Sequence, residues 1–195
     1  MPTRSARRPS AAAALLLAAA LLLAACGGQP SAVEWRNVTI PVPDGWFVVE
    51  EAATHLSLSN TELTPEEVFG GPARGDDAEG SGALDVVGMF FTYEPSTQPG
   101  DWLQYVEDQG ATLESNDQIW LDDDEVPASR IVFSYESAGI PTREMVVVIP
   151  SRGIVVLNQP IPAPGDDDAP EVFLRHVDTF VEVLRASSFG APLLD

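Results

Sequence analysis

Four extended runs joined by short turns, in the second half of the chain, restrict its fold more than any other feature. The runs cover residues 112–121, 126–135, 143–149 and 154–159. Turns this short join only neighbouring antiparallel strands, because a parallel crossover needs about a dozen residues or more. In the second run Ile131, Phe133 and Tyr135 share one face, as side chains of a strand do when they alternate. The sequence therefore predicts an antiparallel meander with a face that needs a cover.

The predicted cover is an amphipathic helix that follows the meander. Asp168 is its expected N-cap, Pro170 lies just inside the helix, and Glu171 completes a capping-box pattern. Large apolar residues recur at helical spacing: Phe173, Val177, Phe180, Val181 and Leu184. Because burial of each such side chain contributes about 1.5–3 kcal/mol, we expect this helix to be the main lid of the sheet. Residues 187–189 are then expected to return the chain to the surface.

The first half of the chain supplies further strands and two short helices. Strands are predicted at residues 38–42, 46–49, 56–59 and 84–93, and helices after Thr64 and at residues 101–109. The turn residues between the first two strands make that pair a predicted hairpin. The predicted class is an α+β fold. In it an antiparallel β-sheet of about six to seven strands is covered by the C-terminal amphipathic helix and a shorter central helix.

The N-terminal segment has the parts of an export signal. Arg4, Arg7 and Arg8 precede an apolar run from 11 to 25, which is shorter than the about 20 residues of a membrane-spanning helix. The run ends in Leu-Ala-Ala-Cys, which resembles the lipobox of bacterial lipoproteins. This resemblance implies that Cys26 carries a diacylglycerol, that the chain is cleaved before it, and that two acyl chains hold the protein stably on a membrane. The predicted organisation is a signal peptide at 1–25, a flexible tether at 26–33 and a single domain at 34–195.

The charge of the chain restricts its partners. It has 30 acidic residues, no lysine and a formal net charge of −20. Such a surface repels nucleic acid and anionic lipid headgroups, so neither is an expected partner. Cys26 is the single cysteine, so no disulfide can form within the domain.

A family resemblance rests on the order of these elements and on two segments. They are Val-Pro-Asp-Gly-Trp at 42–46 and the helix end with its Ser-Ser-Phe sequence at 180–189. Both resemble the PsbP and DcrB-like superfamily, which includes LpqN-type actinobacterial lipoproteins. The resemblance implies a PsbP-like fold and a non-enzymatic accessory or binding role outside the cytoplasm, without a cofactor. Neither segment contains a catalytic residue, and the resemblance does not imply a ligand.

Two acidic clusters are the candidate metal sites. Their calcium-ligand candidates are Asp122, Asp123, Asp124, Asp166 and Asp167. Adjacent carboxylates suit calcium, but neither cluster has the spaced ligands and central glycine of an EF-hand, and a solvated turn is the alternative. His55 and His176 have no His or Cys companion at metal-ligand spacing, so a zinc site is not expected.

Trp120 is the candidate interface residue, because it stands beside the acidic turn at the end of its predicted strand. Trp46 and Trp102 are predicted to belong to the core. Three functions stay open. The first is a membrane-anchored module that docks another envelope protein. The second is a carrier of an apolar ligand or lipid between sheet and helix. The third is a hydrolase, for which no nucleophile and base can be paired in the sequence.

Overall fold

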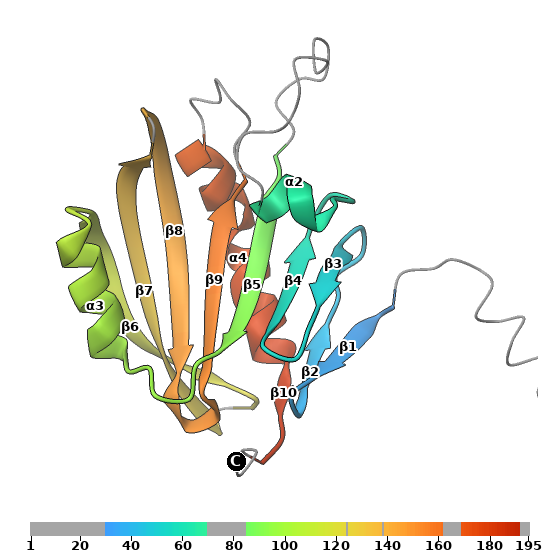
Figure 1. Cartoon of the computed structure of the whole chain (residues 1–195). Helices are drawn as coiled ribbons and strands as arrows, with labels where there is room; N and C mark the ends of the chain where they lie inside the picture. The colour runs from blue at the N-terminus through green and yellow to red at the C-terminus, as the bar shows by residue number, and fades with distance from the viewer. Residues whose placement is uncertain (1–29, 70–84, 124, 138, 162–168, 192–195) are drawn as a thin grey trace, which may run out of the picture.

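A seven-stranded antiparallel sheet forms the centre of the computed structural model, which describes residues 30–69, 85–123, 125–137, 139–161 and 169–191 (Figure 1). In order across the sheet its strands are β3 (Phe47–Glu51), β4 (His55–Ser59), β5 (Val87–Tyr93), β9 (Ile154–Pro160), β8 (Ile140–Ile149), β7 (Val126–Ser137) and β6 (Thr112–Leu121). The predicted α+β class and the size of the sheet are confirmed. The predicted meander is also confirmed, because β6 to β9 pair in sequence order as antiparallel neighbours.

The C-terminal helix α4 (Ala169–Ala186) packs against one face of this sheet and lies behind it in Figure 1. Of the predicted stripe, Phe173, Phe180, Val181 and Leu184 are buried, and Val177 packs at the edge of the same core cluster. The Phe180 ring lies 6.1 Å from the rings of both Trp46 and Phe173, so aromatic contacts hold the helix on the core. The predicted cap Asp168 lies outside the described residues.

A second, three-stranded sheet corrects two of the predictions. It consists of β1 (Ala32–Trp35), β2 (Val38–Pro41) and β10 (Ser188–Phe189), with β2 in the centre. The predicted hairpin of residues 38–42 with 46–49 is wrong, because β2 pairs with β1 and β10 while β3 pairs with β4. The turn between β2 and β3 does form, with a Trp46 N–H to Pro43 O hydrogen bond of 3.0 Å. It redirects the chain because the Trp46 ring is buried against α4.

The end of the chain also differs from the prediction. Residues 187–189 do not return to the surface. Phe189 is buried and pairs with Val38, and the Ser187 hydroxyl donates to the carbonyl of Val183. Burial of the Phe189 ring favours this pairing with a strand far away in sequence. At the other end, β1 begins at Ala32, which lies before the predicted domain boundary at Glu34, and Val33 is part of the core.

The face of the sheet opposite α4 is covered over part of its width. Helix α3 (Pro99–Asp108) contacts β6 and β7 and lies in front of them in Figure 1. Its Val106 is buried with Ile131 and Phe133, and Trp102 packs half-buried at the margin of this second cluster. The other short elements are α2 (Pro65–Phe69) and the 3-10 turn η1 (Pro150–Arg152). The surface of β3, β4 and β5 on this side therefore lies beyond the helix.

The helices that the structure describes do not include one with both the length and the apolar character needed to cross a bilayer.

Truncation of Phe180 tests the packing of α4. We expect Phe180→Ala to lower the free energy of unfolding by about 3–5 kcal/mol, because it removes a fully buried ring and leaves a cavity between Trp46 and Phe173. Urea unfolding followed by tryptophan fluorescence measures the change. Leu174→Ala in the same helix is the matched control, since Leu174 is 47% exposed and its loss should change stability by less than about 0.5 kcal/mol. Equal effects of the two variants would contradict the described packing.

Candidate functional site

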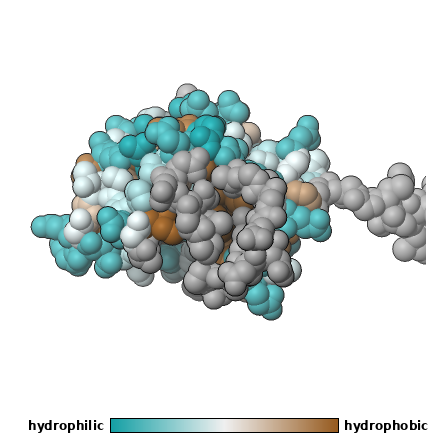
Figure 2. Space-filling view, turned by 90° about the horizontal axis from the view of Figure 1, so that it is seen from above, coloured by the Kyte–Doolittle hydropathy of each residue, from teal (hydrophilic) through white to brown (hydrophobic). Residues whose placement is uncertain are grey.

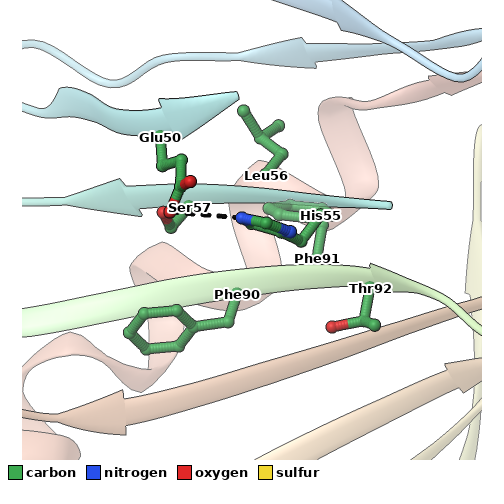
Figure 3. A pocket seen from close by; sticks show the side chains of 7 residues that line it. All are labelled: Glu50, His55, Leu56, Ser57, Phe90, Phe91 and Thr92. Atoms are coloured by element: carbon green, nitrogen blue, oxygen red, sulfur yellow. Dashed lines mark ion pairs between the residues drawn. The ribbon is translucent and has the colours of Figure 1, made fainter. Parts of the chain in front are cut away.

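A groove of about 440 Å³ opens on β3, β4 and β5, on the sheet face away from α4 (Figure 3). Its lining consists of Glu50, His55, Leu56, Ser57, Phe90, Phe91 and Thr92. Side chains alternate along each strand, so the side chains of Leu56 and Phe91 point into the core. These two residues therefore contribute mainly backbone atoms to the lining of the groove. His55, Phe90 and Thr92 therefore form the partly exposed walls, and the buried Ser57 lies between them.

Strand register brings these side chains together. His55 stands opposite Thr92, and Ser57 stands opposite Phe90, in the β4–β5 pair. On the other side of β4, Glu50 stands opposite Ser57 because the register of β3 shifts between Val48 and Glu50. A bulge of this kind turns a side chain to the other face, and here it places a carboxylate on the groove side.

Glu50 and His55 interact at one wall of the groove. The distance from His55 Nε2 to Glu50 Oε2 is 3.2 Å, and the two side chains are 37% and 34% exposed (Figure 3). The contact becomes an ion pair when the imidazole is protonated. At this exposure the pair contributes little to stability.

Ser57 gives the groove a hydrogen-bonding group that the protein does not use. The residue is 1% exposed, and its Oγ has no hydrogen-bond partner. A buried hydroxyl left in this state costs about 1–3 kcal/mol. A molecule in the groove could bond this hydroxyl, and so remove that cost, once the side chains that cover it move aside.

The Phe90 ring forms the apolar wall, and its position depends on Gly88. A Cβ at position 88 would lie 2.6 Å from Cζ of Phe90, so a larger residue would displace the ring. Glycine in a strand leaves room for a neighbouring aromatic ring to cover the backbone. The half-buried Phe90 ring thus gives the groove a flat apolar surface beside the polar side chains.

Ser57, His55 and Glu50 share a face, but they are not connected as a nucleophile, base and acid. Glu50 contacts His55 Nε2, and His55 Nδ1 lies 3.4 Å from the Thr54 hydroxyl, while Ser57 Oγ donates to no group. A hydrolytic triad requires hydrogen-bond reach from the nucleophile to the base. The three side chains therefore do not have the contacts of such a triad in this structure.

A buried carboxylate lies elsewhere on the same sheet face. Glu144 of β8 is 6% exposed and accepts a hydrogen bond of 2.5 Å from the Tyr135 hydroxyl. Burial raises the pKa of Glu144, and the Tyr135 hydrogen bond opposes this in part. Burial and the neighbouring Glu144 also raise the pKa of Tyr135, so this hydroxyl stays protonated as the donor.

The acidic clusters do not form a metal site within the part of the chain that the structure describes. Asp124, Asp166 and Asp167 lie outside the described residues, as does Cys26. Asp122 and Asp123 form the β6–β7 turn, both with φ of 51°. Asp122 Oδ2 accepts a hydrogen bond of 2.9 Å from the Phe189 backbone N–H, so this carboxylate ties the turn to β10.

The predicted interface residue Trp120 is exposed, but it does not lie near the groove. Its side chain is 47% exposed at the end of β6, in a separate hollow of about 370 Å³ that Arg185 also lines. β6 and β3 are the opposite edges of the sheet. Seen from above, the molecule is mainly hydrophilic, with small hydrophobic patches next to the grey atoms (Figure 2). The described surface therefore offers two separate candidate regions.

The groove was not predicted from the sequence. A signal was present in residues 55–59, because alternation that directs Leu56 and Leu58 inward also places His55, Ser57 and Ser59 together on the opposite face. The pairing of that face with Phe90 depends on register, which the sequence does not specify.

Comparisons with known proteins give a distant structural likeness. No family model and no curated protein matches the chain, while three chains of solved structures do. One is a crystal structure of PA94, a protein of unknown function from Pseudomonas aeruginosa. It has 14% sequence identity and a TM-score of 0.41, over 86% of this chain and 100% of that chain. A likeness at this level says nothing about function.

Replacement of Glu144 tests its buried state. Burial raises its folded-state pKa above the ordinary value of 4.5, so the wild type loses stability as pH rises from 4.5 through the raised pKa. We expect Glu144→Gln to raise the free energy of unfolding at pH 7, and to raise it less at pH 4, because the neutral amide avoids the cost of a buried charge that the ionised carboxylate has at the higher pH. Urea titrations at the two pH values measure the difference.

Glu136→Gln is the control for this prediction, since the Glu136 side chain is exposed. It should change stability by less than about 0.5 kcal/mol at either pH. A Glu144→Gln effect that is the same at pH 4 and pH 7 would show that burial does not govern the titration of this carboxyl.

Proposed function

We propose that this chain is a lipid-anchored lipoprotein of the extracytoplasmic face of a cell membrane, and that it acts as a non-enzymatic docking module. Its partner is another envelope protein, and the groove on β3, β4 and β5 receives an extended segment of that partner. The observation that carries this proposal is the open groove itself, in which the apolar Phe90 ring lies beside the Glu50–His55 pair, with the unpaired Ser57 hydroxyl beneath them.

Chain length supports a position close to the membrane. The lipobox resemblance makes Cys26 the attachment point, and β1 begins at Ala32. The residues between them span at most about 3.6 Å each when extended, so the folded domain stays within about 20 Å of the lipid. A partner held in the same envelope layer is therefore within reach of the groove.

The chemistry of the groove favours a peptide segment with an apolar and a basic side chain. An apolar side chain can cover the Phe90 ring, and a backbone amide or carbonyl can bond Ser57 Oγ. Glu50 is one-third exposed, and the chain has a formal charge of −20, so a basic side chain is attracted to this wall. Edge strands and grooves of this kind recognise extended peptides through alternate side chains and main-chain hydrogen bonds.

A carrier of an apolar ligand is the second candidate, and the size of the groove favours it. About 440 Å³ falls within the range of small-molecule sites, which is about 300–1,000 Å³. The ligand would occupy the groove. The space between α4 and the sheet contains packed side chains such as Phe173, Phe180 and Phe91, all fully or almost fully buried.

The anchor is tested by mass analysis of the full chain produced in a bacterium. We expect a mature protein that begins at Cys26 and carries acyl chains, found in the membrane fraction. Cys26→Ala should abolish the lipid mass and release the protein from membranes, because one acyl chain is already marginal for anchoring and none remains. A wild-type protein with an unmodified thiol, or with the leader still attached, would contradict the proposed location.

The groove is tested by photo-crosslinking in intact cells. A photoreactive amino acid replaces Thr92 in the groove, Trp120 in the other hollow, or Leu174 on the exposed side of α4. We expect a discrete protein adduct from position 92 and none from position 174. Ser57→Val should weaken the adduct several-fold, because loss of one hydrogen bond to a bound group costs about 0.5–1.5 kcal/mol.

The crosslinked products separate the candidates. A protein adduct at position 120 with none at 92 would contradict the groove as the docking site and favour Trp120. A lipid or small-molecule adduct at position 92 would contradict the docking module and support the carrier. Circular dichroism of the Ser57→Val protein controls for folding.

A further inference from the structure

Two arginines converge on a small notch outside the groove. Arg36 of the β1–β2 turn and Arg152 of η1 line it together with Asn37, Tyr93 and Gly190. The notch has a volume of about 10 Å³, which is close to the space needed by one water molecule. It therefore has room for an atom or two of a ligand whose remainder lies in solvent.

Arg36 is held in an uncommon backbone conformation. Arg36 and Asn37 have φ of 47° and 61°, the left-handed region that side chains other than Gly, Asn and Asp seldom adopt. The Arg36 guanidinium lies 3.4 Å over the Tyr93 ring, and its Nη1 donates to Ala53 O at 2.8 Å. These contacts fix the guanidinium at the notch. The two-residue turn between the paired Trp35 and Val38 requires a positive φ at both positions, so the β1–β2 hairpin fixes the direction of the Arg36 side chain.

The C-terminal segment closes the notch against the same turn. The Gly190 N–H donates to Asn37 O at 2.8 Å, and Asn37 Nδ2 donates to Ala191 O at 3.3 Å. A Cβ at position 190 would lie 2.9 Å from Asn37 O, so only glycine allows this close approach. The shape of the notch is thus set by backbone contacts.

Both arginines have hydrogen-bonding capacity that the protein leaves unused. Arg152 donates to Ser151 O and to Phe189 O, both at the long distance of 3.4 Å. The Nε atoms of Arg36 and Arg152 are buried and have no hydrogen-bond partner. Since a guanidinium has five N–H donors, each side chain retains donors for another group.

Their charge is also not neutralised by a carboxylate. Arg130, Arg143 and Arg175 each form an ion pair, with Asp117, Glu114 and Asp85 respectively, at 2.6–2.9 Å. For Arg36 and Arg152 the described residues provide carbonyl oxygens as acceptors, and no carboxylate within 4.0 Å. Within the described part of the chain these two cations have no carboxylate partner, although the sequence contains 30 acidic residues.

We propose that Arg36 and Arg152 form a binding site for a single oxyanion, a carboxylate or phosphate group presented by a small molecule or by a partner. The two guanidiniums bind its oxygens through charge-assisted hydrogen bonds at the mouth of the notch. The net negative charge of the domain repels an extended anionic surface, so such a surface is not the proposed ligand. The electrostatic energy of a single anionic group in contact with both arginines depends mainly on these two charges, because charges beyond about 8 Å are screened at physiological salt.

Nuclear magnetic resonance of the arginine Nε–H groups tests the site. The full, lipidated chain in a neutral detergent is titrated with acetate in one series and inorganic phosphate in another, at constant ionic strength. We expect the Nε–H signals of Arg36 and Arg152 to shift together and to saturate, with half-saturation on the order of 1–10 mM, in at least one series. Saturation with acetate alone would identify the bound group as a carboxylate, and saturation with phosphate alone would identify it as a phosphate group.

Arg152→Gln should weaken binding at least about tenfold, because it removes one of the two guanidiniums. Arg185→Gln is the matched control, since it causes the same change in net charge on an exposed residue of α4 and should leave the titration unchanged. If the Gln variant does not fold, Arg36→Gln removes the other guanidinium and is measured instead. The absence of saturation up to about 50 mM in both series, or equal binding by wild type and a folded Gln variant, would overturn the proposal.

Discussion

The fold depends on the aromatic packing between α4 and the seven-stranded sheet. Phe180 lies between Trp46 and Phe173, and the same cluster includes Phe91 from β5 and Phe189 from β10. These residues come from both sheets and from both ends of the chain. Burial of apolar side chains, these rings among them, is the main stabilising term in the described structure, because its ion pairs are at least partly exposed and no disulfide is possible. The small sheet is attached to the large one through this cluster.

The groove is a consequence of unequal cover on the two faces. α4 contacts β5, β6, β8 and β9 on one face, whereas α3 contacts β6 and β7 on the other. The strands beyond α3 carry several polar side chains there, such as Glu50, His55 and Thr92, and the Phe90 ring is the large apolar group that stays partly exposed. A rigid sheet is a precise support for such side chains, since the position of each is fixed by its strand pairs.

Local patterns in the sequence predicted the parts of the fold that depend on neighbouring residues. The meander followed from alternation and short turns, and α4 followed from the helical spacing of Phe173 to Leu184. The hairpin at 38–49 failed because the partners of β2 include β10, and a pairing of Val38 with Phe189 leaves no local trace. The groove and the arginine notch were not predictable for the same reason. Ser57 meets Phe90, and Arg36 meets Arg152, through long-range register and packing.

In the proposed anchored state, the charge of the domain and the length of the tether act together. The acidic body is repelled by anionic headgroups, while the residues between Cys26 and Ala32 limit its distance to about 20 Å. This reach exceeds the Debye length of about 8 Å, so the domain can stand clear of the surface potential without leaving the envelope layer. The repulsion also lowers the competition of bulk lipid headgroups for Arg36 and Arg152. An oxyanion that reaches the notch must then belong to an individual molecule and not to a lipid surface. This discrimination against bulk headgroups is the property that a specific site on an acidic protein requires.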